Sequence, residues 1–515
     1  MDNYIIAYDL GTGGNKAALY DINGEHVAED FVSYQTFYPR PGWHEQCPED
    51  WWEAVVKSTQ NLLLKADINS SAIAAIGISG HSLGVVPLDS NGRLLRETTP
   101  IWSDARATDQ ASKFFVNISE SEWYNITGNG FPAPLYSVFK IMWYRDNEPD
   151  LFSKIYKVIG TKDYINHKLT NTFTTDYSYA SGTGVYDLVN WRYSEELIHI
   201  SKLPSSIFPE IVSSSKVIGN ITPSAAEALG LSTNVKVVAG GVDNSCMAMG
   251  ARNIKDGRIY NSQGSSSWIA VTTSQPILDD DFRPFVFTAA QPGLYNSAVP
   301  VFSAGSSFGW VKDHFCVDLV KEAKNKGVDV YDLMTKLAAQ STPGANGIIF
   351  NPSLGGGSSV DESINIRGAL LGLDLGHTRE DVLRATMEGV ALEMRMALDL
   401  LRKKVDIADE MLVVGGGSRS DLWRQIYADI YKMRIIKTNI DQQAASLGAA
   451  ALAAVGAGFW KDFDRIDKIH EVVDTKQPIA DHVEVYEKIL PVFIKAGKYL
   501  AKLGDDVADL DMWRG

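Results

Sequence analysis

The chain has 515 residues, more than one ordinary core accommodates, and 45% of them are hydrophobic, so we expect two or more folded domains. It carries 48 Lys and Arg against 63 Asp and Glu, a formal net charge of −15. This acidic balance argues against nucleic-acid binding, which depends on cations that neutralise phosphates. Any phosphate ligand must then be held locally, by backbone amides, a metal ion or a few cations.

The cysteines and the apolar segments indicate a cytoplasmic protein without a membrane association. Cys47, Cys246 and Cys316 are odd in number and lack metal-ligand spacing, so we expect reduced thiols. The N-terminus has neither a basic region nor a long apolar core, so we expect no signal peptide. Residues 444–460 form an uncharged, alanine-rich stretch, which contains several glycines and is short for a membrane span. It predicts a buried helix that packs closely through small residues.

The N-terminal part of the chain predicts two strand pairs. Residues 4–7 read as a strand, followed by Asp9-Leu-Gly-Thr-Gly-Gly-Asn-Lys16 and a second strand that ends at the hairpin signal Asn23-Gly24. A second pair of similar design is expected from residues 73–79 and 84–88. Both pairs carry glycines where a strand ends, and glycine allows a backbone to approach a ligand closely.

Later segments repeat this design and add helices. Residues 258–271 read as strand, glycine turn and strand, and apolar strands precede Gly240-Gly241 and the three glycines from Gly415. Residues 378–401 predict a helix with Thr378 as N-cap and Asp381 three residues on. The mixture predicts an α/β fold with two similar halves, which we place at residues 1–250 and 251–515.

The glycine turns discriminate between nucleotide-binding folds. A Walker loop needs Gly-x-x-x-x-Gly-Lys-Ser/Thr, which the chain lacks. A dinucleotide-binding fingerprint must open a helix, whereas the glycines after Asp9 lead into a hairpin. A phosphate-binding β-hairpin fits, although a plain tight turn at Gly13-Gly14 would look the same. Asp9 ends the first strand, where a carboxylate could hold Mg²⁺.

Several motifs in the right order resemble the FGGY carbohydrate kinases, members of the actin-like ATPase superfamily, and in particular the xylulokinase-like branch. Asp9-Leu-Gly-Thr resembles the family's opening, and Trp102-Ser-Asp104-Ala-Arg resembles a sugar-site segment. The other matching segments are residues 77–89, 368–388 and 415–425. Ser137-Val-Phe-Lys140-Ile-Met-Trp143 fits the N-terminal signature, but Leu135 and Tyr144 depart from it.

The resemblance implies a fold, cofactors and site residues. It implies two actin-like (ribonuclease H-like) domains with an interdomain cleft, ATP held mainly by residues 251–515, and sugar held by residues 1–250. Asp243 is then the base that accepts the hydroxyl proton, and Asp9 is the ligand of Mg²⁺. The implied nucleotide contacts are Thr12, Gly13, Gly264, Ser265, Ser266, Gly305, Gly416, Gly417 and Ser420. The implied substrate contacts are His81, Ser82, Trp102, Asp104, Asp243 and Asn244.

Taken without the family, some of these residues have simpler explanations. Asp243 could equally be a helix N-cap or an Asx-turn residue, Gly305 could belong to an ordinary turn, and His81 could be a structural histidine. Xylulokinases place their sugar-contacting histidine two positions later, where this chain has Leu83. Their Gly-Glu-Arg-Thr-Pro segment is replaced by glycines and serines at 355–359.

We therefore expect an ATP-dependent sugar kinase whose substrate is a free ketopentose such as xylulose. The alternatives are another ketose, a polyol or a sugar acid, such as ribulose, glycerol, erythritol or gluconate. An actin-like ATPase without a sugar substrate is a further alternative. A homodimer is expected from the family alone.

Overall fold

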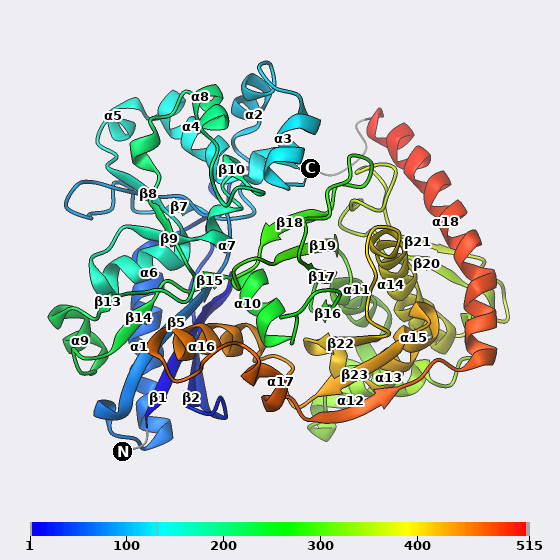
Figure 1. Cartoon of the computed structure of the whole chain (residues 1–515). Helices are drawn as coiled ribbons and strands as arrows, with labels where there is room; N and C mark the ends of the chain where they lie inside the picture. Colours follow the sequence, from blue (N-terminus) through cyan, green and yellow to red (C-terminus); the bar gives the residue numbers. More distant parts are fainter. Residues whose placement is uncertain (1–2, 131, 511–515) are drawn as a thin grey trace. The chain divides into compact units, whose positions relative to one another are not determined.

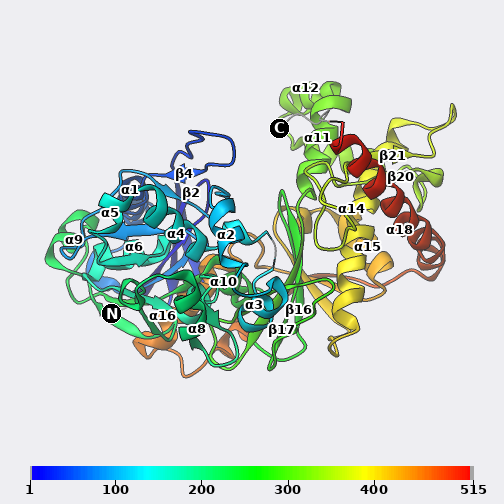
Figure 2. The same ribbon diagram turned by 90° about the horizontal axis from the view of Figure 1, so that it is seen from above.

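The computed structural model describes residues 3–130 and 132–510, which divide into two compact units (Figure 1; Figure 2). Unit 1 consists of Met1–Asp256, Thr272–Ser297 and Gln443–His470. Unit 2 consists of Gly257–Val271, Ala298–Gln442 and Glu471–Gly515. The first break lies close to the boundary expected at residue 250, whereas two later segments return to unit 1. Both units combine a sheet with helices, so the α/β prediction is confirmed.

The sheet of unit 1 runs in the order β13-β14-β5-β1-β2-β3, and β15 also pairs with β5. Strand β1 is antiparallel to β2 and parallel to β5. Strands β2 and β3 are antiparallel to each other, so the predicted Asn23-Gly24 hairpin is confirmed at the turn between them. The strands are β1 (Tyr4–Leu10), β2 (Gly14–Asp21), β3 (His26–Ser33), β5 (Ile73–Gly80), β13 (Val217–Asn220), β14 (Lys236–Val238) and β15 (Gly241–Val242).

Helices pack against both faces of this sheet. Ile6, Tyr8 and Leu10 alternate along β1 and share a core with Trp51 and Val55 of α1 (Pro48–Ala66). The intervening residues of β1, Asp9 among them, face the other side because side chains alternate along a strand. On that side α16 (Ala444–Ala457) contacts β1 and β5, and it also packs along α10 (Asp243–Gly250). The remaining longer helices are α2 (Thr108–Phe114), α3 (Glu120–Thr127), α4 (Ser137–Asn147), α6 (Thr161–Thr170), α8 (Glu195–Ser201), α9 (Pro223–Leu229) and α17 (Arg465–Ile469).

The predicted small-residue helix is confirmed as α16, and its composition has a steric cause. A Cβ on Gly448 would lie 2.0 Å from the carbonyl oxygen of Cys246, and one on Gly250 would lie 1.8 Å from that of Ala444. A Cβ on Gly77 of β5 would lie 2.0 Å from the carbonyl oxygen of Ala449. Backbones therefore touch directly where α10, α16 and β5 meet, and only glycine fits at these contacts.

Unit 2 repeats the local topology of unit 1. Strand β16 is antiparallel to β17 and parallel to β22, as β1 is to β2 and β5, which supports the expected likeness of the two halves. The strands of the sheet that lie wholly or partly in unit 2 are β16 (Ile259–Gln263), β17 (Ser267–Thr273, which ends in unit 1), β19 (Tyr295–Val301, which begins in unit 1), β22 (Glu410–Val414), β23 (Arg434–Thr438) and β24 (Val472–Lys476). The helices are α11 (Gly305–Phe315), α12 (Val317–Lys326), α13 (Val330–Ala338), α14 (Arg379–Arg402), α15 (Asp421–Tyr431) and α18 (Ala480–Ala508).

Two further expectations have different outcomes. Helix α14 begins after Thr378, whose backbone N–H donates to Asp381 Oδ2 at 2.9 Å, so the predicted helix and cap are confirmed. The prediction that residues 73–79 and 84–88 form a strand pair was wrong. Residues 86–88 form β6 (Val86–Leu88), which pairs with β8 (Lys157–Ile159) and not with β5, because the chain turns away at Leu83, whose φ is +59°.

The three cysteines carry free thiols, as expected. Among residues 3–130 and 132–510, none of the helices combines the length and apolar character that a bilayer-spanning segment requires.

The contact between α10 and α16 can be tested by adding one methyl group. We expect Gly448→Ala to lower the free energy of unfolding by about 1–3 kcal/mol, because overpacking outweighs the better helix propensity of alanine. Gly497→Ala is the matched control, since Gly497 lies inside α18 and a Cβ there meets no atom within 4 Å. Urea unfolding measures both. Equal stability of the two variants would contradict the close contact.

Candidate functional site

Two aspartates of unit 1 lie at the ends of strands β1 and β15, which both pair with β5. Asp9 stands beside Ser79 in the parallel register of β1 and β5, and Ser79 Oγ donates to Asp9 Oδ1 at 2.9 Å. Gly241 of β15 is also a register partner of Ser79, and α10 begins at Asp243, two residues later. Strand β5 thus brings the two predicted catalytic residues to one edge of the sheet.

Both carboxylates have raised pKa values, and the charge of Asp9 contributes to the shift of Asp243. Burial raises the pKa of Asp9, while the hydrogen bond from Ser79 and the charge of Lys16 oppose this effect. Burial also raises the pKa of Asp243 to about 7; the Asn244 backbone N–H opposes this, and the negative charge of Asp9 adds to it. Lys16, left out of the predicted site, is the register partner of Asp9 across the hairpin. Asn244 follows Asp243 in the first turn of α10.

The turn after β1 is exposed and connects two predicted groups. Thr12 and Gly13 are exposed, and a Cβ on Gly13 would meet no atom within 4 Å. Thr12 Oγ1 accepts a hydrogen bond from Trp102 Nε1 at 2.9 Å, and its carbonyl accepts one from Gln46 Nε2 at 2.8 Å. Trp102 is 40% exposed. A predicted phosphate-contacting residue and a predicted sugar platform are therefore bonded to each other.

His81 lies inside unit 1. It is 1% exposed, its ring meets Trp51 edge to face with centroids 5.6 Å apart, and its Nδ1 lies 3.3 Å from Thr161 Oγ1. Burial lowers the pKa of His81 to about 4, so the ring is neutral at pH 7. Nε2 has no hydrogen-bond partner among the residues that the structure describes. Ser82, next in the chain, is half-buried.

Asp104 is fully buried, and its carboxylate is occupied by donors. Arg106 Nε and Nη2 donate to its two oxygens at 2.9 and 2.7 Å, and the His44 backbone N–H donates to Oδ2 at 2.7 Å. The guanidinium of Arg106 also donates to Glu45 at 2.6 Å. The carboxylate therefore fixes the segment that presents Trp102.

Sequence reasoning missed the role of Lys140, a buried amine between two predicted sugar-site segments. Its Nζ donates to the carbonyl of Leu83 at 3.1 Å and to that of Ile101 at 2.6 Å, so it ties residues 81–83 to the strand end before Trp102. Burial lowers the pKa of Lys140 to about 7, the charge of Asp104 opposes this, and that of Arg106 adds to it. The signal was present, since Lys140 belongs to the N-terminal signature segment.

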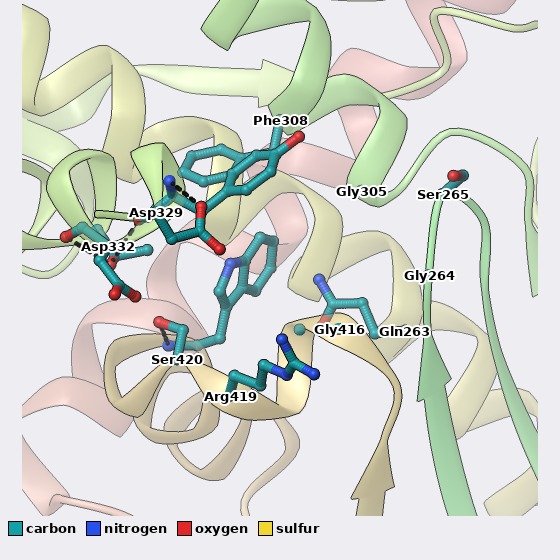
Figure 3. Close-up of a pocket in the computed structure, with 14 residues that line it drawn as sticks. Gln263, Gly264, Ser265, Gly305, Phe308, Asp329, Asp332, Gly416, Arg419 and Ser420 are labelled. Atoms are coloured by element: carbon teal, nitrogen blue, oxygen red, sulfur yellow. Dashed lines mark hydrogen bonds between the residues drawn. The ribbon is translucent and has the colours of Figure 1, made fainter. Parts of the chain in front are cut away.

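Unit 2 contains a cavity of about 330 Å³ (Figure 3). Six predicted nucleotide contacts line it, and they come from three glycine-rich segments. They are Gly264, Ser265, Gly305, Gly416, Gly417 and Ser420. Ser266 belongs to the same turn as Gly264: the Gly264 N–H donates to the carbonyl of Ser266 at 2.9 Å.

Local packing explains the glycines of this cavity. The N–H of Gly305, at the start of α11, donates to the carbonyl of Gly264 at 3.1 Å, and a Cβ on Gly305 would lie 2.2 Å from that oxygen. A Cβ on Gly416 would meet no protein atom within 4 Å and would enter the cavity. Ser420 caps α15 by accepting from the Trp423 N–H at 3.3 Å.

Aromatic and acidic residues that sequence reasoning missed complete the cavity wall. The ring of Phe308 stacks on Tyr331 and meets Trp423 edge to face, with centroids 5.9 Å apart in both pairs. Asp329 and Asp332 line the same space (Figure 3). Trp423 lies six residues after Gly417, inside the matching segment 415–425, and this membership is the signal that could have indicated it.

In the described part of the chain, no group of three or more His, Cys, Asp or Glu residues is placed to hold a metal ion. Mg²⁺ is commonly bound through only one or two carboxylates together with substrate phosphates. Asp9 and Asp243 present oxygen ligands that fit such a site: Ser79 donates a hydrogen bond to Asp9, and the charge of Asp9 adds to the raised pKa of Asp243.

The raised pKa of Asp243 predicts a pH-dependent stability. Between the ordinary carboxyl pKa near 4 and about pH 7 the folded chain keeps a proton that the unfolded chain releases, so this stabilisation is lost as the pH rises through 7. We expect Asp243→Asn to melt at a higher temperature than the natural chain at pH 8, with the difference shrinking toward pH 4. Thermal unfolding across this range measures it. A difference that does not vary with pH would contradict the raised pKa.

Comparisons with known proteins agree with this geometry. Residues 4–250 match the model of the N-terminal domain of the FGGY family of carbohydrate kinases, and residues 259–457 match that of the C-terminal domain. The chain is 29% identical over 495 residues to a xylulose kinase of Bacillus subtilis, covering 95% of this chain and 96% of that protein. It is 28% identical over 512 residues to a gluconokinase of the same organism, covering 99% and 98%.

A solved structure supports the fold as well. The ligand-bound xylulose kinase of Lactobacillus acidophilus has a TM-score of 0.88 at 27% identity and covers 97% of this chain and 98% of that one. The expected pair of actin-like α/β domains is thereby confirmed. The chain belongs to the FGGY family of carbohydrate kinases and is an ATP-dependent sugar kinase.

Proposed function

We propose that the enzyme transfers the γ-phosphoryl group of ATP to a hydroxyl of a free ketopentose such as xylulose, and that Asp243 accepts the proton of that hydroxyl. The observation that carries this proposal is the half-buried carboxylate of Asp243, whose pKa burial raises to about 7. A general base works best when its pKa lies near the working pH. The attacking oxygen forms a bond to phosphorus, the bond to ADP breaks, and the proton moves to the carboxylate.

The cavity of unit 2 has the chemistry of an adenine nucleotide site. Phe308, Tyr331 and Trp423 offer apolar surfaces to a base, and the carboxylates of Asp329 and Asp332 can accept hydrogen bonds from ribose hydroxyls. Turns at Gly264 and Gly416 expose backbone groups without a Cβ. We assign the nucleotide to residues 251–515 and the sugar to residues 1–250, with Thr12 and Gly13 of the β1–β2 turn at the phosphates.

We assign Mg²⁺ to Asp9, whose oxygens are the hard ligands that this ion prefers. When bound, the ion compensates the negative charge of the phosphates during transfer. Asp9 itself is held in place by Ser79 and stands opposite the cation Lys16. We assign the role of ligand to Asp9 and that of base to Asp243, whose pKa is raised mainly by burial.

The sugar-site segments favour a neutral sugar over a sugar acid. A carboxylate substrate needs a cation that can reach it, but the side chains of Arg106 and Lys140 are fully covered and already paired, one with Asp104 and Glu45 and the other with two carbonyls. Trp102 offers an exposed apolar surface, and Ser82 and Asn244 offer polar groups. We propose that His81 and Asp104, both buried, support these groups from behind.

The nucleotide assignment is tested at the start of α11. Gly305→Ala puts a methyl group against the carbonyl of Gly264, and overpacking of this kind costs about 1–3 kcal/mol. We expect the KM for ATP to rise about tenfold with little change in the KM for the sugar. Gly309→Ala, on the same helix, is the control, because its Cβ would meet only the Tyr331 hydroxyl at 3.5 Å. An equal KM for ATP in both variants would contradict the assignment of the nucleotide to this cavity.

The substrate and the base are tested together by ADP release with xylulose, ribulose, glycerol, erythritol and gluconate. We expect xylulose to give the highest kcat/KM. Asp243→Asn should lower kcat by about 10²–10⁴ while ADP binding is retained. Asp109→Asn is the control, since Asp109 is an exposed carboxylate in the first turn of α2.

Each contrary result has a distinct meaning. Preferential turnover of gluconate would show that a sugar acid is the substrate. ADP release that no sugar stimulates would contradict the ketopentose proposal altogether, and full activity of Asp243→Asn would leave Asp243 a structural role.

A further inference from the structure

A buried charge cluster lies behind the segment that leads to Asp243. It consists of Lys162, Asp163 and Asp176, none more than 1% exposed. Lys162 Nζ lies 2.6 Å from Asp163 Oδ1 and 2.9 Å from Asp176 Oδ1. Lys162 and Asp163 belong to the first turn of α6, and Asp176 ends β9 (Thr174–Asp176). Burial alone would lower the pKa of Lys162, but the two carboxylates raise it, so the amine stays charged.

Such a cluster is costly unless its remaining hydrogen bonds are satisfied. Asp163 Oδ2 accepts from the Gly160 N–H at 3.2 Å. Asp176 Oδ2 accepts from the backbone N–H of Ser178 at 2.9 Å, from the Ser178 hydroxyl, and from the Ser214 hydroxyl at 2.7 Å. Because the mechanism assigned to Asp9 and Asp243 uses none of these groups, the cluster calls for another explanation.

The cluster holds the segment from Ala239 to Val242 at both ends. Lys162 Nζ and Asn166 Nδ2 donate to the carbonyl of Ala239 at 3.1 and 2.7 Å. At the other end, the N–H of Val242 donates to Ser178 Oγ at 3.0 Å. Between them, Gly240 has a φ of +74° and its N–H donates to the Ser214 carbonyl at 2.9 Å.

Asp243 depends on this segment for its position. Its own side chain accepts from the N–H of Asn244 at 2.8 Å, which fixes the carboxylate relative to α10 but not relative to the sheet. Val242 is the last residue before the helix, and its N–H is bonded to Ser178. A general base must be held to a fraction of an ångström, since a displacement of about 1 Å can cost about 10²-fold in rate.

We propose that Ser178 is a positioning residue for Asp243. Its hydroxyl links the Lys162–Asp176 ion pair to the backbone N–H of Val242, the residue before Asp243. This inference rests on the proposed function of Asp243 as the base. Ser178 does not act on the substrate. Its hydroxyl donates to Asp176 and thereby presents its lone pair to the Val242 N–H, so the helix start is fixed in one register.

The chain offers a matched pair of variants. Ser178 and Ser214 are both 1% exposed, and both hydroxyls donate to Asp176 Oδ2, but only that of Ser178 also accepts from Val242. We expect Ser178→Ala to lower kcat by about 10- to 10²-fold with little change in either KM. Ser214→Ala should stay within about twofold of the natural kcat. Both variants should lose thermal stability to a similar extent, because each removes one donor from the same buried carboxylate.

A double-mutant cycle separates positioning from general damage. If Ser178 acts through Asp243, Ser178→Ala should cost little further activity once Asp243→Asn is present. Losses that multiply in the double variant, or equal kcat values for Ser178→Ala and Ser214→Ala, would overturn the positioning role. If Asp243→Asn alone retained full activity, the proposed base would fail first. Should Ser178→Ala not fold, the nearly isosteric Ser178→Cys, with a weak donor and acceptor, should show an intermediate loss of kcat.

Discussion

The parallel pairing of β1 with β5 is the constraint on which the site in unit 1 depends. It sets Asp9 beside Ser79, and the same residue of β5 pairs with Gly241, so the start of α10 is brought to the strand next to the one that carries Asp9. Because a shift of one residue turns every side chain to the opposite face, this register determines whether Asp9 faces the same side of the sheet as α10. The apolar side chains of β1 that pack on α1 fix the register from the opposite face.

The second layer of support is backbone contact. Gly77, Gly250 and Gly448 allow β5, α10 and α16 to approach until carbonyl oxygens occupy the space of a side chain. Close packing of this kind leaves little freedom for a helix to slide. The helix that begins at Asp243 is therefore held along its length by α16 and at its first residue by the polar network around Asp176. A segment more than 190 residues later in the chain thus forms part of the environment of Asp243.

The sequence predicted the class of reaction better than the residues that surround the candidate site. Glycine turns, the hairpin at Asn23-Gly24 and the capped helix after Thr378 are local, so short motifs suffice to predict them. The pairing of β6 with β8 depends on residues 157–159, and no local pattern indicates that partner. The same holds for Lys140, Lys162 and Asp176. Charged residues are ordinarily exposed, and no local pattern indicates that these three are buried. His81 and Asp104 stay predicted substrate contacts; their burial involves α6 and Arg106, which the motifs do not specify.

The hydrogen bond from Trp102 to Thr12 has a thermodynamic consequence. It joins the turn assigned to the phosphates with the indole assigned to the sugar, so a ligand that reorients the Thr12 hydroxyl changes the interactions available to Trp102. Coupling of this kind is reciprocal: whatever factor one substrate applies to the affinity of the other must be returned in equal measure. Under the assignments proposed above, this single indole N–H would make each substrate a heterotropic effector of the other.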